Sequence, residues 1–357
     1  EDCENCIDDD GDGLVDRADP DCAAPANGAG LGVGDAEVGK AVDKCAKAIR
    51  KVGAKLASNR LKQLGACEKA VADCVQLKPG DAACLAKAQG KCTKAKTALP
   101  GAEAKLTAAI VTSCGEPAVT TANLLTAVGL GFDGETASCQ DKNLESVATV
   151  ADVAECVRRQ HVCAAERTLG VTVPRARELL VLGGFDTTDF GCLAATANGG
   201  GSAIAAERRK AIRKCDGAIQ KAAAKLLAGR TKAGQACAAA EFSCAQTKPN
   251  DQACVDKAGA TCAKAVAALP KLQAAFASTI VKSCGTPLDA ADLLAPEGLG
   301  AGGLAASCAR LGVPSLASVA DVSTCLERQL SCRADQLLES TTPRADELLG
   351  IGGVSLP

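Results

Sequence analysis

A run of carboxylates near the start of the sequence has the spacing of ligands for a hard cation. When Asp8 is counted as the first position of a loop, carboxylates occupy positions one, three, five, nine and twelve. Gly13 stands at position six, where a calcium loop turns sharply, and the apolar Val15 stands at position eight. Oxygen ligands with this spacing wrap around one divalent cation, so the pattern predicts a Ca²⁺ site. The alternative is a solvated acidic tail.

The segment from about residue 6 to residue 22 resembles the calcium loops of dockerins and of thrombospondin type 3 repeats, which also end in Asp rather than Glu. No second loop and no flanking EF-hand helices accompany it in the sequence, so we do not expect pairing with a second hand. We expect the calcium to have a structural role. The ligands that the resemblance implies are the side chains of Asp8, Asp10, Asp12, Asp16 and Asp19 and the carbonyl oxygen of Leu14.

The 22 cysteines are candidates for metal binding, redox chemistry or disulfide formation. The sequence contains no CxxC–CxxC zinc pattern and no CxxCH haem pattern, and its one close pair is Cys3 with Cys6. Structural disulfides are therefore the interpretation we favour. Cysteine at this density, without a catalytic pattern, indicates an oxidising compartment, so we expect a secreted, extracellular protein.

The single histidine, His161, lies in the sequence RRQHVC. A Ser–His–Asp or Cys–His site would require this histidine to be placed and partnered. Leu330 stands at the matching position of the second half of the chain, which favours an exposed or packed helix residue. Acid and base carboxylates cannot be singled out among so many acidic residues. We therefore predict no catalytic residues and no enzymatic activity.

Basic residues are concentrated in two segments. Residues 40–105 carry fifteen bases and five acids, and residues 207–282 carry fourteen bases and five acids. The segments that follow them are acidic, and residues 1–35 carry eleven acids against one base. Basic helices can bind nucleic acid or anionic lipid, but the sequence has no Trp or Tyr on which bases would stack. We expect no nucleic acid partner and interpret these segments as solvated helix faces.

Composition limits what the core gains from burial. Apolar residues make up 47% of the 357, but many are Ala, with five Phe and no Trp, Tyr or Met. Small side chains bury little area each, at about 25 cal/mol per Å², so covalent bonds should supplement the core. No apolar run approaches the roughly 20 residues that span a bilayer, so we expect no membrane span. No signal peptide is present, and we expect Glu1 to begin a processed, mature protein.

The spacing of the cysteines occurs twice. The peptides SCGEP and PRARELL also have later counterparts in SCGTP and PRADELL, and Cys22 maps onto Cys192. A repeat of this length predicts two tandem copies of one unit. Cys45, Cys67, Cys74, Cys84, Cys92 and Cys114 recur 170 residues later as Cys215, Cys237, Cys244, Cys254, Cys262 and Cys284, and Cys139, Cys156 and Cys163 recur 169 residues later as Cys308, Cys325 and Cys332.

Each unit is predicted to be all-α. Apolar side chains follow a helical stripe from residue 36 onward, with Lys and Arg elsewhere, and strand signals are weak throughout. Pro100 should break a helix, and the Gly-rich residues 116–145 should be irregular, with short helical turns. We expect helices over 36–57, 60–77, 81–98, 102–114 and 147–168 and a short helix from Pro174 to the glycines 183–184, with the same course from 204 to 350.

Cysteine pairs on either side of a Pro-Gly turn predict a disulfide ladder. In an antiparallel helix hairpin, facing residues have a nearly constant sum of residue numbers, which is 158 for Cys74 with Cys84 and 159 for Cys67 with Cys92. The predicted bonds are Cys67–Cys92, Cys74–Cys84, Cys237–Cys262 and Cys244–Cys254 for the two ladders, and Cys114–Cys139 and Cys284–Cys308 across the irregular segments, with Cys22, Cys45, Cys156 and Cys163 left to join the first and fifth helices.

These patterns divide the chain into an acidic calcium-binding segment, two disulfide-stapled helical repeats and a linker between them. The predicted boundaries are 1–35 for the acidic segment, 36–184 for the first repeat, 185–203 for the linker and 204–357 for the second repeat.

Our leading interpretation of function is a secreted structural protein that assembles head to tail into an extracellular filament or surface layer. Cys22 stands 23 residues before Cys45, as Cys192 stands 23 residues before Cys215. The end of one chain and the start of the next would therefore repeat the internal junction, a contact that does not close on itself. The alternative is a monomeric extracellular module that binds an anionic glycan or surface polymer through its basic helices.

Overall fold

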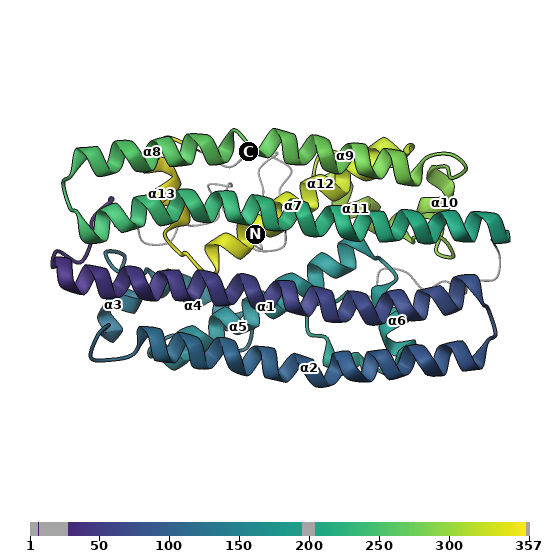
Figure 1. The fold of residues 1–357 in the computed structure, drawn as a ribbon, viewed down its shortest axis with the longest axis horizontal. Helices are drawn as coiled ribbons and strands as arrows, with labels where there is room; N and C mark the ends of the chain where they lie inside the picture. Colours follow the sequence, from purple (N-terminus) through teal and green to yellow (C-terminus); the bar gives the residue numbers. More distant parts are fainter. Residues whose placement is uncertain (1–5, 7–27, 195–203, 355–357) are drawn as a thin grey trace.

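The computed structural model describes residue 6 and residues 28–194 and 204–354, and all of the regular structure in these residues is helical (Figure 1). The first half contains α1 (Ala36–Leu77), α2 (Ala82–Cys114), α3 (Thr121–Leu125), the 3₁₀ helix η2 (Phe132–Glu135), α4 (Thr136–Gln140), α5 (Val150–Thr172), α6 (Ala176–Leu182) and η3 (Thr187–Asp189). The second half contains α7 (Ala206–Thr247), α8 (Gln252–Val266), α9 (Leu269–Cys284), α10 (Ala290–Leu294), η4 (Ala301–Leu304), α11 (Ala305–Arg310), α12 (Val319–Glu339) and α13 (Ala345–Ile351).

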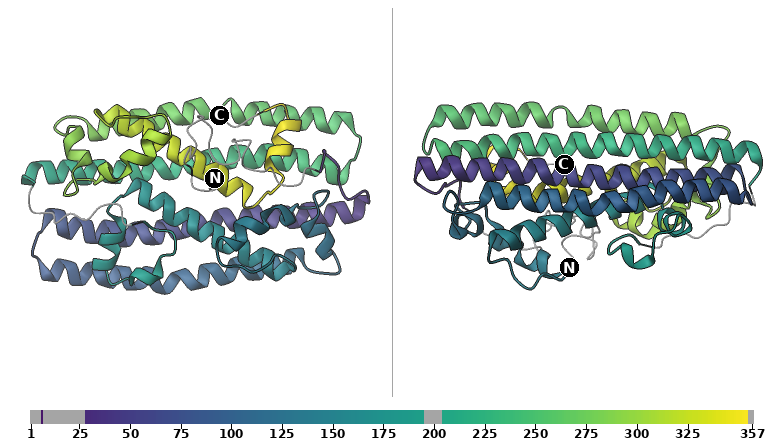
Figure 2. Two further views of the ribbon diagram at one scale, coloured as in Figure 1. Left: turned by 180° about the vertical axis from the view of Figure 1, so that it is seen from behind. Right: turned by 60° about the horizontal axis from the view of Figure 1, so that its bottom comes forward.

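The long helices lie side by side in one layer (Figure 1). Within this layer α1 packs between α2 and α7, and α7 packs against α8 and α9. The remaining helices cover one side of the layer, with α5 against α1 and α2 and with α12 against α7 and α9 (Figure 2). In the described part of the chain, no other element covers the opposite side of the long helices.

Two predicted helix breaks in the first half are wrong. The helix α1 is continuous from Ala36 to Leu77, because residues 57–60 contain neither Gly nor Pro and the buried stripe continues to Leu64. The helix α2 runs through Pro100, although proline in a helix interior removes one hydrogen bond and favours a kink. Disulfides to α1 on both sides of Pro100 hold α2 against its neighbour. In the second half the first predicted break is also absent, because α7 is continuous from Ala206 to Thr247. The break at proline is present there, and α9 begins at Leu269 with Pro270 in its first turn.

Both long hairpins turn in the same way. Lys78 and Lys248 end the first helix of each hairpin, and the backbone then takes a left-handed conformation at Gly80 (φ 81°) and at Asn250 (φ 67°). Gly and Asn are the residues that tolerate this conformation best. The side chain of Asp81 then caps α2 by accepting a hydrogen bond from the backbone N–H of Cys84.

The predicted ladders are confirmed, and each has a third rung that the sequence analysis assigned wrongly. Cys114 bonds to Cys45 rather than to Cys139, and the sum of their residue numbers, 159, is that of Cys67 with Cys92 in the same antiparallel hairpin. Cys284 likewise bonds to Cys215 rather than to Cys308. The rungs are Cys45–Cys114, Cys67–Cys92 and Cys74–Cys84 between α1 and α2, and Cys215–Cys284, Cys237–Cys262 and Cys244–Cys254 between α7 and the α8–α9 segment.

The prediction that Cys22, Cys45, Cys156 and Cys163 tie the first and fifth helices together is also wrong for the last three, and Cys22 lies outside the described residues. Residues 139 and 308 instead face the helices that follow them, so their disulfides close short loops. Helix α1 is held to α5 by packing, and no disulfide joins these two helices among the described residues. Among the described residues, the remaining bonds are Cys139–Cys156, Cys308–Cys325, Cys163–Cys192 and Cys6–Cys332.

The hydrophobic core crosses the boundary between the two halves. The cluster built on α1, α2 and α5 also contains Ala238 and Phe242 of α7 and Leu348 of α13. Phe242 is 1% exposed, and the guanidinium groups of Arg50 and Arg344 lie over its ring, 6.0 and 5.7 Å from the centroid. The two halves of the chain are therefore packed into one body along α1 and α7.

Candidate functional site

The predicted calcium ligands Asp8, Asp10, Asp12, Leu14, Asp16 and Asp19 lie outside the described residues, so the Ca²⁺ site stays a prediction. The described residue nearest to them in sequence is Cys6, which is fully buried and bonded to Cys332 of α12 with a Cα–Cα distance of 5.8 Å. The chain is thus anchored covalently two residues before Asp8. Among the described residues, no group of three or more His, Cys, Asp or Glu side chains is placed to hold a metal ion.

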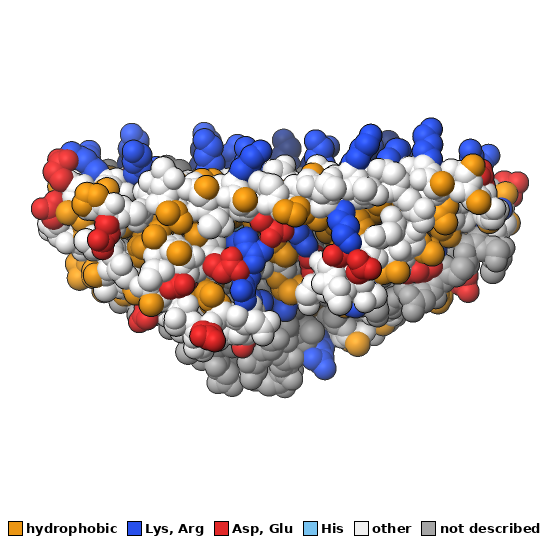
Figure 3. All heavy atoms as spheres, turned by 90° about the horizontal axis from the view of Figure 1, so that it is seen from below, with side chains coloured by type: hydrophobic (Ala, Val, Ile, Leu, Met, Phe, Trp, Pro, Cys, Tyr) orange, Lys and Arg blue, Asp and Glu red, His pale blue; other side chains and the backbone are white. Residues whose placement is uncertain are grey.

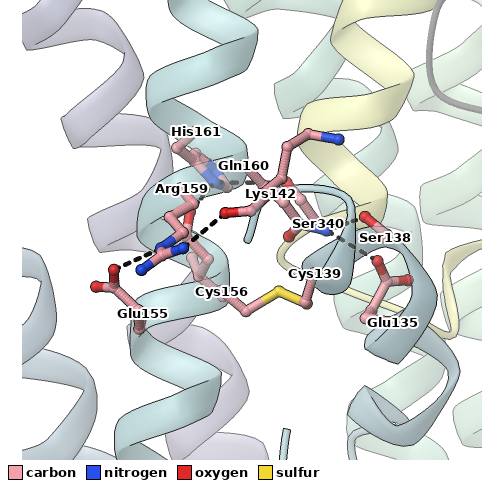
Figure 4. Close-up of a disulfide and its surroundings, with 11 residues drawn as sticks. Glu135, Ser138, Cys139, Lys142, Glu155, Cys156, Arg159, Gln160, His161 and Ser340 are labelled. Carbon is pink, nitrogen blue, oxygen red and sulfur yellow. Dashed lines mark hydrogen bonds and ion pairs between the residues drawn. A yellow bond between two sulfur atoms is a disulfide. The ribbon is translucent and has the colours of Figure 1, made fainter. Parts of the chain in front are cut away.

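His161 is a packed helix residue, which is one of the two forms that the sequence analysis expects. It is 1% exposed on α5, and its Nδ1 lies 2.9 Å from the carbonyl oxygen of Val157 (Figure 4). Burial lowers the pKa of His161 to about 4, so the ring is neutral at pH 7. Its Nε2 faces Gly53 and has no hydrogen-bond partner among the described residues. In the part of the chain that the structure describes, no carboxylate is hydrogen-bonded to the ring, as the orienting residue of a catalytic triad would be.

The polar groups around His161 hold the short helix α4 against α5. Gln160 donates hydrogen bonds to Glu135 and Ser138, at 3.1 and 2.7 Å, beside the Cys139–Cys156 disulfide (Figure 4). Arg159 donates to the carbonyl oxygen of Lys142 at 2.6 Å. Each contact holds the segment 135–142 against α5, so these polar side chains have a structural role.

The open side of the long-helix layer carries rows of exposed lysines that project from one flat side of the molecule (Figure 3). We call this set the lysine face. Its members are Lys40, Lys44, Lys47, Lys51, Lys55, Lys62 and Lys69 on α1, Lys87, Lys91, Lys94 and Lys105 on α2, Lys210, Lys214, Lys221, Lys225 and Lys232 on α7, and Lys257, Lys264, Lys271 and Lys282 on α8 and α9.

Helical periodicity places these lysines opposite the core. On α1, Lys44, Lys51 and Lys55 are seven and four residues apart, a spacing that returns a side chain to the same helix face. The buried residues Ile49 and Leu56 lie on the other face of the same helix. The other long helices have the same arrangement, so their lysine rows become parallel when the helices pack side by side.

Carboxylates on the long helices are mostly turned away from the lysine face. Asp43, Glu68, Asp216 and Glu241 are each less than 7% exposed and lie between helices or against the inner layer. Among the described residues, two lysines of the face have a carboxylate within 4 Å: Lys40, with Glu37, and Lys47, with Asp43. The positive charge of the lysine face is therefore largely uncompensated within this part of the chain.

Arginine and lysine occupy different depths in this layer. Arg60 is 5% exposed and pairs with Glu103 and Glu166, and Arg230 is 2% exposed and pairs with Asp335 of α12. A guanidinium is weakly hydrated and forms several directed hydrogen bonds, so it suits buried ion pairs better than an ammonium does. The exposed positions carry lysine, whose ammonium groups remain hydrated.

The lysine face is long and has little relief. Exposed residues between the lysines include Ala54, Ser58 and Ala66 on α1 and Ala224 and Ala228 on α7, all of them small. Helix α1 has 42 residues, which is about 63 Å at ~1.5 Å per residue. With neighbouring axes about 8–10 Å apart, the outer helices of the layer are about 30 Å apart. Such a surface matches a flat, repetitive partner better than a small ligand.

The sequence analysis identified the basic helices but interpreted each as a separate solvated face. The signal that it did not use is that the lysines of all long helices recur at intervals of three, four, seven or eleven residues, which puts each set on one face. The joining of these faces into one plane depends on tertiary packing. No helix in the described residues combines the length and the low charge content that crossing a bilayer requires.

A scan against protein-family models, a search of curated proteins and a search of solved structures each found no match for this chain.

Proposed function

We propose that the protein is a secreted, disulfide-stapled module that binds an anionic polymer at an extracellular surface through the lysine face. The observation that carries this proposal is the collection of exposed lysines on one flat side, while few carboxylates of the same helices (Glu37, Glu207 and Asp256) are exposed. A plane of ammonium groups attracts a partner with repeated negative charges. Ten disulfides among the described residues fit an oxidising, extracellular setting.

An acidic polysaccharide is the partner we favour within this class. Single-stranded nucleic acid is bound by stacking on aromatic rings, and the sequence has no Trp or Tyr. The Phe residues of the described chain are buried. The surface residues between the lysines are mostly Ala, Ser, Thr and Gly, and the larger apolar side chains exposed on these helices are isolated (Leu77, Val111 and Val281), so they offer little apolar area for insertion into a lipid surface. A hydrated polyanion needs neither stacking nor insertion.

Binding of the full-length protein to immobilised polygalacturonate at several NaCl concentrations tests the proposal. The affinity should fall steeply with salt, because binding releases counterions and salt screens the charges. Replacing Lys51 and Lys55 by Gln should weaken binding about tenfold or more, since a lysine near an anionic surface contributes about 1 kcal/mol. The matched control replaces Lys142 and Arg310, which lie outside the lysine face, and should have a much smaller effect. Equal losses in the two double variants would argue against the proposal.

The two halves of the chain are, in our proposal, tandem copies of one unit. The ladder disulfides support this, because their sequence separations of 69, 25 and 10 residues are the same in both halves. The copies would together give the lysine face twice the area of one unit. Calcium bound by the N-terminal loop would stabilise the acidic segment, and we propose no enzymatic activity.

Head-to-tail assembly into a filament or surface layer remains a second candidate, favoured by the repeated cysteine spacing. One disulfide limits how such an assembly could be linked. Cys163 bonds to Cys192 at the junction inside the chain, but the matching Cys332 bonds to Cys6 of the same chain. The corresponding bond to a neighbouring molecule is therefore not available, and assembly would have to be noncovalent at this point. Light scattering with and without a calcium chelator tests it, and a monodisperse 35.6 kDa species at high concentration in calcium would contradict it.

A further inference from the structure

A groove of about 420 Å³ opens at the tip of the first helical hairpin, where α1 ends and α2 begins. Its volume lies in the range of small-ligand sites, about 300–1,000 Å³. The apolar part of its lining consists of Ala70, Ala83 and Ala88 and the Cys74–Cys84 disulfide. Because these side chains are small, the two helices leave a shallow hollow between them.

Three lysines, Lys78, Lys87 and Lys91, also line this groove, and all three are exposed. The two acidic residues in the lining are engaged elsewhere. Asp73 accepts a hydrogen bond from Arg213 Nε at 3.0 Å, and Asp81 accepts one from the backbone N–H of Cys84 at 2.9 Å. Within the described residues, none of the three lysines has a carboxylate within 4 Å, so the groove presents net positive charge without an internal partner.

We propose that this groove binds one anionic pyranose unit, a uronate, of the polysaccharide that the proposed function places on the lysine face. The inference rests on that proposed function and assigns it a specific subsite. The lysines would donate charge-assisted hydrogen bonds to the carboxylate. The exposed Ala83 and the half-buried Cys84 would contact the C–H face of the sugar ring, above the buried Ala70 and Ala88. Lys87 and Lys91 belong to the lysine face, so a chain seated in the groove continues onto that face.

The second half of the chain provides an internal comparison. At the matching positions Lys248 and Lys257 are retained, but Thr261 replaces Lys91. Lys248 also has a carboxylate partner, with its Nζ 3.9 Å from Asp251. Ser243 replaces Asp73, so the net charge of the matching lining is the same, but the second hairpin offers two lysines instead of three, and one of them is paired. We expect the uronate site in the first half only.

Methyl NMR of the full-length protein, labelled with ¹³C in its alanine methyl groups, tests the assignment. Sodium glucuronate should shift the methyl signals of Ala70, Ala83 and Ala88, and should leave those of Ala253 and Ala258 unchanged. Glucose and inorganic phosphate are the comparison probes. Equal shifts with phosphate would overturn the sugar assignment, because the groove would then bind any small anion.

Two matched variants decide which residues are responsible. Replacing both Lys87 and Lys91 by Gln should weaken glucuronate binding about fivefold or more, whereas Lys257→Gln should leave it unchanged. Thr261→Lys should produce new shifts at Ala253 and Ala258. Equal weakening by Lys257→Gln would mean that the attraction is diffuse, and would overturn the subsite.

The outcome separates this inference from the function on which it rests. If polygalacturonate binds with the expected salt dependence but glucuronate shifts none of these methyl groups, the subsite is wrong and the proposed function stands. If glucuronate binds in the groove but the polymer does not bind to the lysine face, the proposed function is wrong and the groove remains a uronate site.

Discussion

The side-chain amide of Gln76 donates a hydrogen bond to the backbone carbonyl oxygen of Glu297, at 2.8 Å and 221 residues away in sequence. The second half makes the equivalent contact with the first: the side-chain amide of Gln246 donates a hydrogen bond to the carbonyl oxygen of Val128, also at 2.8 Å. Gln246 stands 170 residues after Gln76. The end of each long first helix therefore holds a loop of the opposite half.

Loss of either amide should destabilise the packing between the halves. Gln76 and Gln246 are 2% and 1% exposed, and a buried polar group that loses its partner costs about 1–3 kcal/mol. Gln246→Ala should cost more than Gln76→Ala, because the Gln246 side chain also accepts a hydrogen bond from the backbone N–H of Val33. Urea unfolding of the oxidised protein measures both.

Gln89→Ala is the control for this pair, since Gln89 is exposed and its one hydrogen bond, to the carbonyl oxygen of Leu182, stays within the first half. Its effect should be within about 0.5 kcal/mol of zero. Gln76 and Gln246 variants that unfold like the control would show that these contacts do not stabilise the fold.

The third rung of each ladder should stabilise more than the rung nearest the turn. Cys45–Cys114 closes a loop with a sequence separation of 69, against 10 for Cys74–Cys84. The chain-entropy model then gives about 4 kcal/mol for the longer loop and about 3 kcal/mol for the shorter. Serine pairs at the two sites, compared by denaturant unfolding, measure the difference. Non-reducing peptide mapping should recover Cys114 linked to Cys45, and a link to Cys139 would contradict the fold.

Glu68 should make the protein less stable at alkaline pH. Burial, together with the nearby charge of Asp216, raises the pKa of Glu68 from 4.5 to about 8, against the opposing effects of Arg213 and Gln220. The folded state thus keeps a proton that the unfolded chain releases at about pH 4.5. Stability from this group is present below pH 4.5 and declines as the pH rises to about 8.

Glu68→Gln keeps the shape of the side chain but cannot ionise, so it should flatten the stability profile between pH 5 and pH 8. Glu37→Gln, at an exposed position of the same helix, is the control and should keep the wild-type slope. Unfolding in urea across this pH range makes the comparison, and an unchanged slope in Glu68→Gln would refute the assignment.

His161 should have the opposite effect, at acid pH. Its pKa is lowered from 6.5 to about 4 by burial, so the folded state resists a proton that the unfolded chain accepts. Stability from the neutral ring is present above pH 6.5 and is lost as the pH falls towards 4. His161→Leu copies Leu330 of the second half and should remove this loss. Thermal unfolding at pH 4.5 and pH 7 tests it, with Leu330→Ile as a packing control that should retain the acid sensitivity.

Calcium should order the N-terminal segment. Residues 1–35 have a net charge of −10, and a divalent ion held by several carboxylates reduces their mutual repulsion. A lone extracellular loop suggests a dissociation constant of about 10⁻⁴ to 10⁻³ M. Calorimetry on the oxidised protein should show this binding, and Asp12→Ala should weaken it strongly while Asp21→Ala should not. If calorimetry shows no heat of binding at millimolar calcium, the predicted Ca²⁺ site is wrong.

The local sequence pattern was sufficient to predict the helical class and part of the disulfide pairing. The amphipathic stripes predicted the helical class, and the constant sum of residue numbers predicted the two ladder rungs nearest each turn. The same rule also identifies the third rung, since Cys45 and Cys114 sum to 159, as Cys67 and Cys92 do. The sequence analysis did not assign this rung, because it expected the helix to end at Pro100. Pro100 and Pro270 both lie between two ladder disulfides, but only α2 continues through its proline, so the ladder does not decide helix continuity.

The sequence by itself determined that Lys44 and Lys51 share one face of α1 and that Lys214 and Lys221 share one face of α7. Only the tertiary structure decided that these faces form one plane, because the rotation of each helix about its axis is set by what it buries. Arg213 of α7 pairs with Glu68 and Asp73 of α1, and Gln220 of α7 donates a hydrogen bond to Glu68; these contacts fix the rotation of both helices and leave their lysine rows on the same side. The pairing of Cys6 with Cys332 is likewise a tertiary outcome, since no local spacing relates two residues 326 positions apart.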